Sequence, residues 1–412
     1  MVGPFLPDAE KLTAVREALP ALAAGIYLNT GSVGPLPAET AAAMAELETY
    51  ERDFGRAHPD YFDEFLARMA EARAGVAAVV GADVGSVALM HSTTDGMNAG
   101  ASLPDWRSGG RAVSTAHEHA GGLGPLYALR DRVGIELDLV DAGDDGDDDR
   151  TVAAMDAAIT SDTRLVSISH VLWTTGAVLP VARIAAIAHD RGALLLVDGA
   201  QAAGAIPTRV DELGADLYGV SAQKWLLGPE GMGALVVAPS LVEHAVPANA
   251  GWYSFEQANT PGTADWWPDA RRFEASGWHR PSVVGMARSI GWLSMYVGLD
   301  FVYRRGTELA ARLAGRLASI PGVRLLTPRD RMATLVTIRI DGWPAQQALD
   351  ELGGRIFVVA RTIPSLDALR FSVGFFNTED ELDRVAEAIE LLATHTPDSL
   401  PPRRLLTILG ED

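Results

Sequence analysis

Short apolar runs alternate with amphipathic stretches between about residue 70 and about residue 240. The amphipathic stretches, such as VARIAAIAHDRG, repeat apolar positions with the helical period, whereas the apolar runs have the length of buried strands. This alternation is typical of βαβ units and predicts an α/β fold with a largely parallel, doubly wound sheet. Ligands of such sheets bind beyond the carboxyl ends of the strands. The strand-like runs are SVALM, RAVST, LVSIS, ALLLVD, LYGVS and GALVVA.

The periodic pattern stops in residues 250–282, where Gly, Pro and polar residues surround Trp252, Trp266, Trp267 and Trp278. A non-periodic segment of this length is usually functional or disordered, and its tryptophans argue against disorder. Two interpretations stay open. The segment lines a wide pocket for a bulky apolar or sugar-like group, or it packs in the core or between subunits.

A different pattern follows the tryptophan-rich segment. A long helical stretch precedes the strand-like runs ATLVTIRI and ALRFSVGF, and the acidic helix TEDELDRVAEAIELLATH comes last. This order predicts a smaller α+β domain at the C-terminal end. We expect a large domain over residues 31–282, a small domain over 283–412, and an N-terminal segment, 1–30, that packs with the small domain.

Composition excludes several classes of function. Of the 412 residues 48% are hydrophobic and 21% charged, as in ordinary globular proteins. A net charge of −20 argues against a nucleic-acid partner. No apolar run is long enough to span a bilayer and the start resembles no secretory signal, so we expect a cytoplasmic protein without a membrane partner. The absence of cysteine excludes disulfides and a protein persulfide.

Two patterns suggest a metal site and fail. When the acidic tract 138–149 is aligned as a calcium loop on Gly146, Gly143 and Val152 fall on positions that need ligands, so a solvated turn is the better account. His117 and His119 share one face of a strand, but no third ligand stands nearby. We therefore predict no metal.

Lysine is scarce in this chain. Lys and Arg together number 34, but only Lys11 and Lys224 are lysines. A guanidinium keeps its proton, whereas a desolvated ammonium can lose one and attack a carbonyl, so Schiff-base chemistry requires lysine. Lys224 follows a strand-like run, and only its surroundings distinguish a catalytic lysine from a surface one. Asp198, at the end of ALLLV, either caps a helix or pairs with a cationic ligand atom. A carboxylate on a pyridinium nitrogen, opposite a lysine, makes pyridoxal phosphate an electron sink.

The segments 197–204 (VDGAQAAG), 221–235 (SAQKWLLGPEGMGAL) and 369–383 (LRFSVGFFNTEDELD) resemble the class V aminotransferase family. The resemblance extends from about Tyr27 to about Leu391. Within the family, the chain most resembles the branch of cysteine desulfurases, selenocysteine lyases and isopenicillin N epimerases. It implies the pyridoxal-phosphate-dependent transferase fold type I, with a mainly parallel seven-stranded sheet in the large domain. It also implies pyridoxal 5'-phosphate, an amino-acid substrate, and a homodimer with shared active sites.

The resemblance assigns roles around the cofactor ring. Lys224 matches the Schiff-base lysine and Asp198 the partner of the pyridinium nitrogen. Gln201 matches a residue near the phenolic oxygen, and His119 matches the aromatic residue that stacks on the ring. We favour this role of His119 over metal binding.

The resemblance also assigns residues that bind the phosphate and residues that bind the substrate. Thr93, Thr94 and Asp95 match a phosphate-binding turn whose N–H groups open a helix, although Thr94 as a simple cap is compatible with that role. Ser221 and Gln223 match side chains that reach the phosphate. For the substrate, Arg370 matches the arginine that grips the α-carboxylate. Arg361 matches a second arginine of the branch, with a structural salt bridge as the open alternative, and Ser32 matches a residue close to the substrate.

Departures from the family pattern bear on the reaction. Desulfurases carry a mobile loop with a reactive cysteine where ARTIPSLDALR closes the gap in a few residues. Trp173 stands where the branch has Asn near the phenolic oxygen. Ser276-Gly277 stands where Gly-Thr of a partner subunit often reaches the phosphate.

A desulfurase-like site without its cysteine favours β-elimination. We expect a carbon–sulfur β-lyase that acts on a cysteine S-conjugate in natural-product biosynthesis, with Lys224 moving the α-proton. It would resemble the enzymes that trim S-cysteine conjugates in lincosamide antibiotic pathways. Three alternatives stay open: a decarboxylation-coupled oxidative deaminase, an epimerase or aminotransferase of class V, and a scaffold without cofactor.

Overall fold

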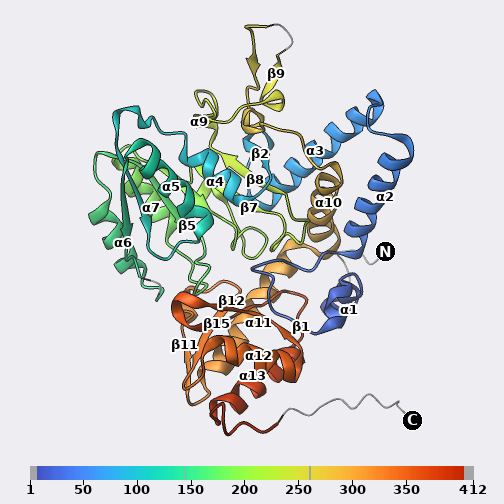
Figure 1. Ribbon diagram of the computed structural model, residues 1–412, viewed down its shortest axis with the longest axis vertical. Helices are drawn as coiled ribbons and strands as arrows, with labels where there is room; N and C mark the ends of the chain where they lie inside the picture. Colours follow the sequence, from blue (N-terminus) through green and yellow to red (C-terminus); the bar gives the residue numbers. More distant parts are fainter. Residues whose placement is uncertain (1–6, 144, 259–260, 403–412) are drawn as a thin grey trace.

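A mostly parallel sheet of seven strands forms the centre of the computed structural model, which describes residues 7–143, 145–258 and 261–402 (Figure 1). The strand order is β2-β8-β7-β6-β5-β3-β4, and only the two pairings made by β8 are antiparallel. The α/β architecture predicted from the alternating runs is confirmed. The strands are β2 (Val87–Met90), β3 (Arg111–Thr115), β4 (Glu136–Val140), β5 (Thr163–Ser169), β6 (Leu194–Asp198), β7 (Leu217–Ser221) and β8 (Gly233–Val237).

Helices cover both faces of this sheet, because successive strand residues point to opposite faces. In β6, Leu195 and Val197 pack into one core with α3, α7 and α10, whereas Leu196 packs on the other face with α4 and α5. None of the helices in the described part of the chain combines the length and apolarity needed to cross a membrane. The α-helices between residues 38 and 291 are α2 (Ala38–Phe54), α3 (Pro59–Val80), α4 (Thr93–Ala101), α5 (Ala120–Val133), α6 (Asp148–Ala158), α7 (Val181–Asp190), α8 (Val210–Leu213), α9 (Pro239–Val242) and α10 (Arg280–Gly291).

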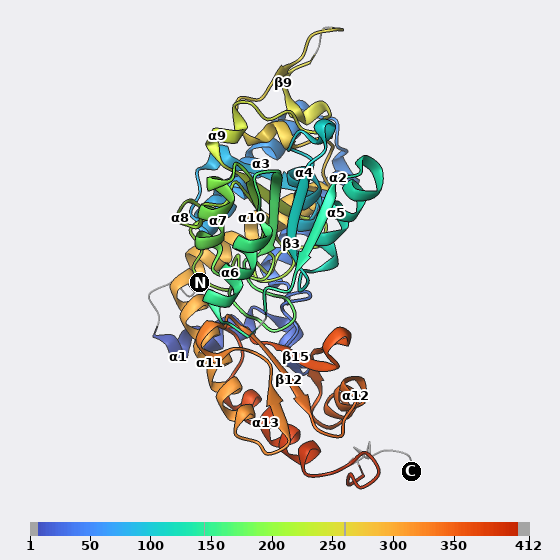
Figure 2. The same ribbon diagram turned by 90° about the vertical axis from the view of Figure 1, so that its left-hand side faces the viewer.

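A second, antiparallel sheet of four strands, in the order β11-β12-β15-β14, lies below the large sheet in Figures 1 and 2. Three helices supply most of the apolar side chains that pack against it. The elements are α11 (Leu299–Ala318), α12 (Ala345–Ile356), α13 (Glu379–Ala393), β11 (Val323–Leu325), β12 (Leu335–Ile340), β14 (Arg361–Ile363) and β15 (Ala368–Ser372).

The N-terminal region contacts this smaller unit. After α1 (Asp8–Glu17), β1 (Ile26–Tyr27) pairs in parallel with β13 (Val358–Val359). The core shared with the large sheet continues through Tyr303, and the second core begins at Leu309, so the change occurs inside α11. The predicted domain ranges remain a prediction.

The tryptophan-rich segment forms a hairpin, β9 (Phe255–Gln257) with β10 (Asp265–Trp266). Figures 1 and 2 show it projecting from the end of the molecule opposite the small sheet. Trp252, at its base, is 62% exposed. The hairpin therefore does not line a pocket between the two sheets of its own chain.

Candidate active site

The residues predicted to bind the cofactor gather at the carboxyl edge of the large sheet. Asp198 ends β6, Ser221 ends β7, and Thr93 follows β2 and opens α4. Lys224 lies just beyond β7, in a turn closed by hydrogen bonds from Leu227 N–H to the Lys224 carbonyl (3.2 Å) and from Gly228 N–H to that of Ala222 (2.8 Å). The α/β topology thus brings together side chains from segments far apart in the chain.

The amine of Lys224 is tuned by its surroundings. Burial lowers the pKa of Lys224 from 10.5 to about 8, the charge of Asp198 acts against this shift, and Arg370 and Arg361 add to it. A lowered pKa leaves more of the amine unprotonated near neutral pH, as a Schiff-base lysine requires.

Asp198 is buried, and its Oδ1 accepts a hydrogen bond from Ala200 N–H at 2.9 Å. Asp198 therefore accepts from a backbone N–H as a cap would, but the residues that follow it form a turn instead of the helix considered from the sequence. Oδ2 faces the start of α5, where a Cβ on Gly122 would lie 3.7 Å from it. One carboxylate oxygen serves the backbone, and the other is directed towards the site, so the two roles of Asp198 are compatible.

Gln201 connects the sheet to the N-terminal segment. Its Oε1 accepts from Trp225 Nε1 at 2.9 Å, and its Nε2 donates to the Gly31 carbonyl at 2.8 Å. This leaves one N–H of the amide for another acceptor. The role near a phenolic oxygen remains a prediction.

His119 and Trp173 form an aromatic pair, edge to face, with ring centroids 5.2 Å apart. The Nδ1 of His119 accepts from Gly121 N–H at 3.0 Å and caps α5. Burial lowers the pKa of His119, and the charge of Lys224 adds to the effect, so the neutral ring is favoured. The indole N–H of Trp173 is buried and has no hydrogen-bond partner among the described residues.

Two arginines meet beside this pair. Arg361 on β14 and Arg370 on β15 are register partners, and both donate to Ser32 Oγ, at 3.3 and 3.4 Å. Arg370 also donates to the Trp173 carbonyl at 2.7 Å, and the Arg361 guanidinium lies 5.5 Å from the centroid of the Trp173 ring. No salt bridge of Arg361 is found among the described residues, and its role stays a prediction.

The helix that starts at Thr93 offers an anion site. Ser92 caps it by accepting from Asp95 N–H at 3.0 Å, so the alternative of Thr94 as the cap is wrong. The hydroxyl of Thr93 is buried without a partner, and the first N–H groups of a helix lack intrahelical acceptors. The Oγ1 of Thr94 approaches Gly121 so closely that a Cβ there would lie 2.5 Å away.

The remaining predicted phosphate residues flank this turn. Ser221 is buried at the end of β7, and the Gln223 carbonyl accepts from Gly34 N–H at 2.7 Å. On the other side, His91 stacks on Trp278 at 4.3 Å and lies 3.4 Å from the Gly277 carbonyl. The segment Ser276-Gly277 therefore lies beside the residues that precede α4.

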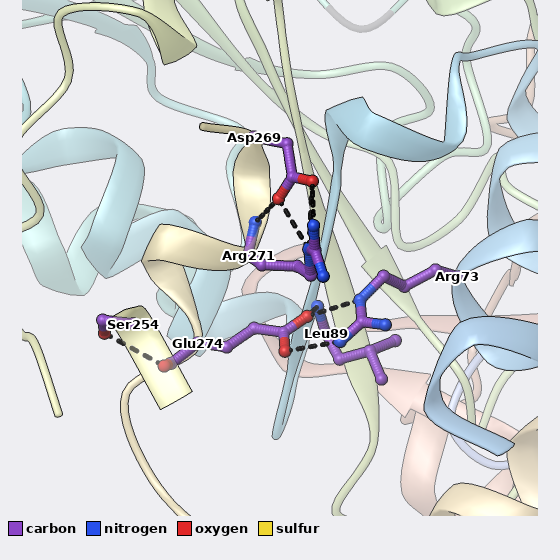
Figure 3. A network of polar contacts seen from close by, with 6 residues as sticks. All are labelled: Arg73, Leu89, Ser254, Asp269, Arg271 and Glu274. Atoms are coloured by element: carbon purple, nitrogen blue, oxygen red, sulfur yellow. Dashed lines mark hydrogen bonds and ion pairs between the residues drawn. The ribbon is translucent and has the colours of Figure 1, made fainter. Parts of the chain in front are cut away.

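A buried ion pair, absent from the sequence interpretation, fixes that segment (Figure 3). Glu274 accepts from Arg73 Nε and Nη2, at 2.8 and 2.7 Å, and from Leu89 N–H at 2.9 Å. Leu89 belongs to β2, which is an edge strand, so the carboxylate satisfies an N–H on its unpaired side. Arg73 and Glu274 are 201 positions apart in the chain, and no local pattern signals their contact.

Glu118 is a second residue that the sequence interpretation missed. It lies between His117 and His119, and its buried carboxyl contacts the hydroxyls of Thr115 and Ser169. The only signal in the sequence was an acidic residue within the HxH pair. No group of three or more metal-ligating side chains occurs among the described residues.

Comparison with known proteins identifies the family. The model of the family described as "Aminotransferase class-V" matches residues 26–385. The chain belongs to the class V aminotransferase family. Isopenicillin N epimerase of Streptomyces clavuligerus is 30% identical over 390 residues, which cover 89% of this chain and 94% of that protein. A probable cysteine desulfurase of Methanothermobacter thermautotrophicus is 27% identical over 398 residues, which cover 92% of this chain and 97% of the relative.

Solved structures agree with this assignment. The cystine C–S lyase C-DES, in complex with its product cysteine persulfide, superimposes with a TM-score of 0.84 at 26% identity and covers 92% of this chain and 100% of its own. A lysine-to-alanine mutant of C-DES, with glycine covalently linked to its PLP cofactor, gives 0.85 at 25% identity, with 91% and 98% covered. The class V chain thus has fold type I and is a pyridoxal-phosphate-dependent, cysteine-desulfurase-like enzyme, as the resemblance implied.

The residues of this class V site fit pyridoxal phosphate. Thr93 Oγ1, Trp173 Nε1 and Arg370 Nε are buried polar atoms of the site that have no hydrogen-bond partner in the described part of the chain. A helix N-terminus suits the phosphate, Asp198 suits a cationic ring nitrogen, and Lys224 is an activated amine.

Proposed function

We propose that this class V enzyme is a carbon–sulfur β-lyase that cleaves an S-substituted cysteine by β-elimination. The observation that carries the proposal is the short hairpin between Arg361 and Arg370 in a chain without cysteine. The resemblance to C-DES, a cystine C–S lyase, supports it.

The hairpin leaves no room for a loop that carries a nucleophile. Arg361 pairs with Arg370 and Ile363 with Ala368, so only four residues separate the last register partners, and they form the turn. Its tip is held at both sides, since Asp367 Oδ1 accepts from Ala345 N–H at 2.9 Å and the Leu366 carbonyl accepts from Arg339 Nε at 2.5 Å. With no protein sulfur acceptor, the sulfur leaves as a free thiolate.

Each residue then has a defined task. Pyridoxal phosphate, when bound, supplies the electron sink for the pair released at the substrate α-carbon. With the cofactor bound, Asp198 would hold the ring nitrogen cationic, and Lys224 would take the α-proton. The Cβ–S bond breaks with its electron pair on sulfur, and water converts the remaining enamine to pyruvate and ammonia.

Two arginine cations and one serine hydroxyl orient the substrate. Arg370 and Arg361 bind the α-carboxylate, and Ser32 Oγ lies between them as a further contact. His119 would stack on the cofactor ring, and Trp173 lies edge to face with His119. A bulky S-substituent and a role in natural-product biosynthesis belong to this proposal.

One alternative has a specific observation in its favour. The isopenicillin N epimerase of Streptomyces clavuligerus is 30% identical, which supports epimerisation at the α-carbon by the same Lys224. Oxidative deamination with decarboxylation differs from the lyase in consuming oxygen, and transamination in requiring an oxo acid.

Product analysis with S-methylcysteine separates these reactions. The proposal expects pyruvate, ammonia and methanethiol without an added oxo acid. A requirement for an oxo acid would indicate an aminotransferase instead of a lyase. Uptake of oxygen with release of carbon dioxide would indicate the oxidative deaminase, and racemisation without thiol would indicate the epimerase.

We further propose a cytoplasmic homodimer in which Ser276-Gly277 reaches the phosphate of the partner. Exposed aromatic side chains on neighbouring elements support an interface: Phe54 is 77% exposed, and Trp252 lies 5.8 Å from Phe62. Sedimentation with and without cofactor tests the dimer, and a monomeric active enzyme would contradict it.

A further inference from the structure

Glu118 has the surroundings of a carboxyl group that keeps its proton. It is buried, with 8% of its surface exposed, and no described Lys, Arg or His lies within ion-pair distance of it. Burying a charged carboxylate without a cation is costly, and such groups become neutral instead.

Hydrogen bonds hold the Glu118 carboxyl in place, and burial without a cation is what favours its neutral form. Thr115 Oγ1 accepts from His117 N–H at 3.3 Å and donates to Glu118 Oε1 at 2.7 Å. Because a backbone N–H can only donate, the Thr115 hydroxyl proton is free to point to Glu118. Oε2 contacts Ser169 Oγ, whose described side-chain hydrogen bonds go only to Glu118. Ser169 Oγ donates to Oε2 in this structure, and in the neutral acid the hydroxyl turns to accept the proton of Oε2.

The contact with Ser169 links Glu118 to the cofactor site. Ser169, the last residue of β5, is the register partner of Asp198 on β6. On the other side, Glu118 directly precedes His119, which caps α5. One side chain therefore connects the turn between β3 and α5, which carries His119, with β5, the strand beside Asp198.

We propose that Glu118 is a positioning residue: as a neutral acid it ties His119 to the sheet beside Asp198, and it adds no second carboxylate charge beside Asp198. Release of its proton to solvent adds a second negative charge near Asp198. This inference concerns the same site as the proposed function but does not depend on the lyase reaction.

The titration of Glu118 falls in an accessible range. Burial raises its pKa from 4.5 to about 7, the hydroxyls of Ser169 and Thr115 oppose this shift, and the charge of Asp198 adds to it. The charged and titratable groups around it are Asp198 from β6, the flanking His117 and His119, and His170 after β5. His117 is directed towards Asp141, at 3.2 Å, and burial lowers the pKa of His170 to about 4.

The first test uses the apoprotein. Infrared spectra of wild type labelled with [13C]glutamate should contain a protonated carboxylic acid band at about pH 6 that is lost by about pH 8. Glu118→Gln should remove the band, and the exposed control Glu243→Gln should keep it. A band absent from wild type overturns the proposal, and this result needs no variant to fold.

Folding equilibria give an independent readout. Because the folded-state pKa is raised, the stability due to Glu118 is full below about pH 4.5 and falls as the pH rises to about 7. The folding constant of Glu118→Gln relative to wild type should therefore rise by up to about tenfold per pH unit over this window. A ratio that stays flat contradicts a retained proton.

Cofactor titrations test positioning. Glu118→Gln keeps the hydrogen-bonding shape of the neutral acid, so it should bind pyridoxal phosphate like wild type, whereas Glu118→Ala should bind at least about tenfold more weakly. The cofactor absorbance should show a titration step near pH 7 in wild type and in Glu243→Gln, and none in Glu118→Gln. Equal cofactor binding by the Ala and Gln variants overturns the positioning role. If Glu118→Gln has the same absorbance step as wild type, Glu118 does not tune the site, whatever the reaction proves to be.

Discussion

Arg361 and Arg370 face each other across the β14–β15 hairpin, and neither has a carboxylate within ion-pair distance among the described residues. Burial lowers the pKa of Arg370 to about 9, and the charge of Arg361 adds to the shift. Two cations held side by side, one fully buried and the other half-buried, gain most from an anion that binds between them. The pair is therefore built for a substrate carboxylate.

Replacing either arginine by lysine should weaken substrate binding. A lysine keeps the charge but loses the planar fork, so we expect KM for a cysteine S-conjugate to rise about 10- to 100-fold in Arg370→Lys, with a smaller rise in Arg361→Lys. Steady-state kinetics measure this effect, with the exposed Arg324→Lys as control. Unchanged KM in both variants would remove them from the substrate site.

Capture of the cofactor by the apoenzyme should follow the titration of Lys224. Because burial lowers its pKa to about 8, the free-amine fraction rises through that pH rather than near 10.5. The rate of formation of the lysine-bound absorbance should increase about tenfold per pH unit below pH 8 and then level off. A rate that keeps rising to about pH 10 would contradict a tuned amine.

The Arg73–Glu274 pair should be strongly coupled. Removing one partner leaves a buried charge unpaired, so Arg73→Met and Glu274→Gln should each cost about 3–5 kcal/mol of unfolding free energy. The double variant should cost clearly less than the sum, which denaturant titration of all four proteins measures. Additive losses would show that the two side chains act independently.

Much of this fold was predictable because the signal was local. Continuous apolar runs such as Leu194–Val197 indicated buried parallel strands, and the scarcity of lysine drew attention to Lys224. Side chains that follow strand ends are brought together by the α/β topology alone, as Asp198 and Lys224 are.

Contacts between distant segments were not predictable. Glu274 meets Arg73 and the edge of β2 only after the sheet and α3 have formed, and its neighbours in sequence carry no corresponding pattern. Glu118 was hidden for a related reason, because its hydroxyl partner Ser169 lies on another strand. The observed cap of α4 is Ser92 and not Thr94, which the sequence allowed as an alternative. Both residue types can cap a helix, and the sequence does not determine where the first turn begins.

Reduction with borohydride, followed by peptide mass mapping, tests the central claim most directly. The chain has only two lysines, so Lys11 is an internal control for Lys224. We predict that the mass of the reduced cofactor is found on Lys224 alone and that Lys224→Ala loses both this adduct and turnover. Cofactor mass on Lys11, or on no lysine, would contradict the account.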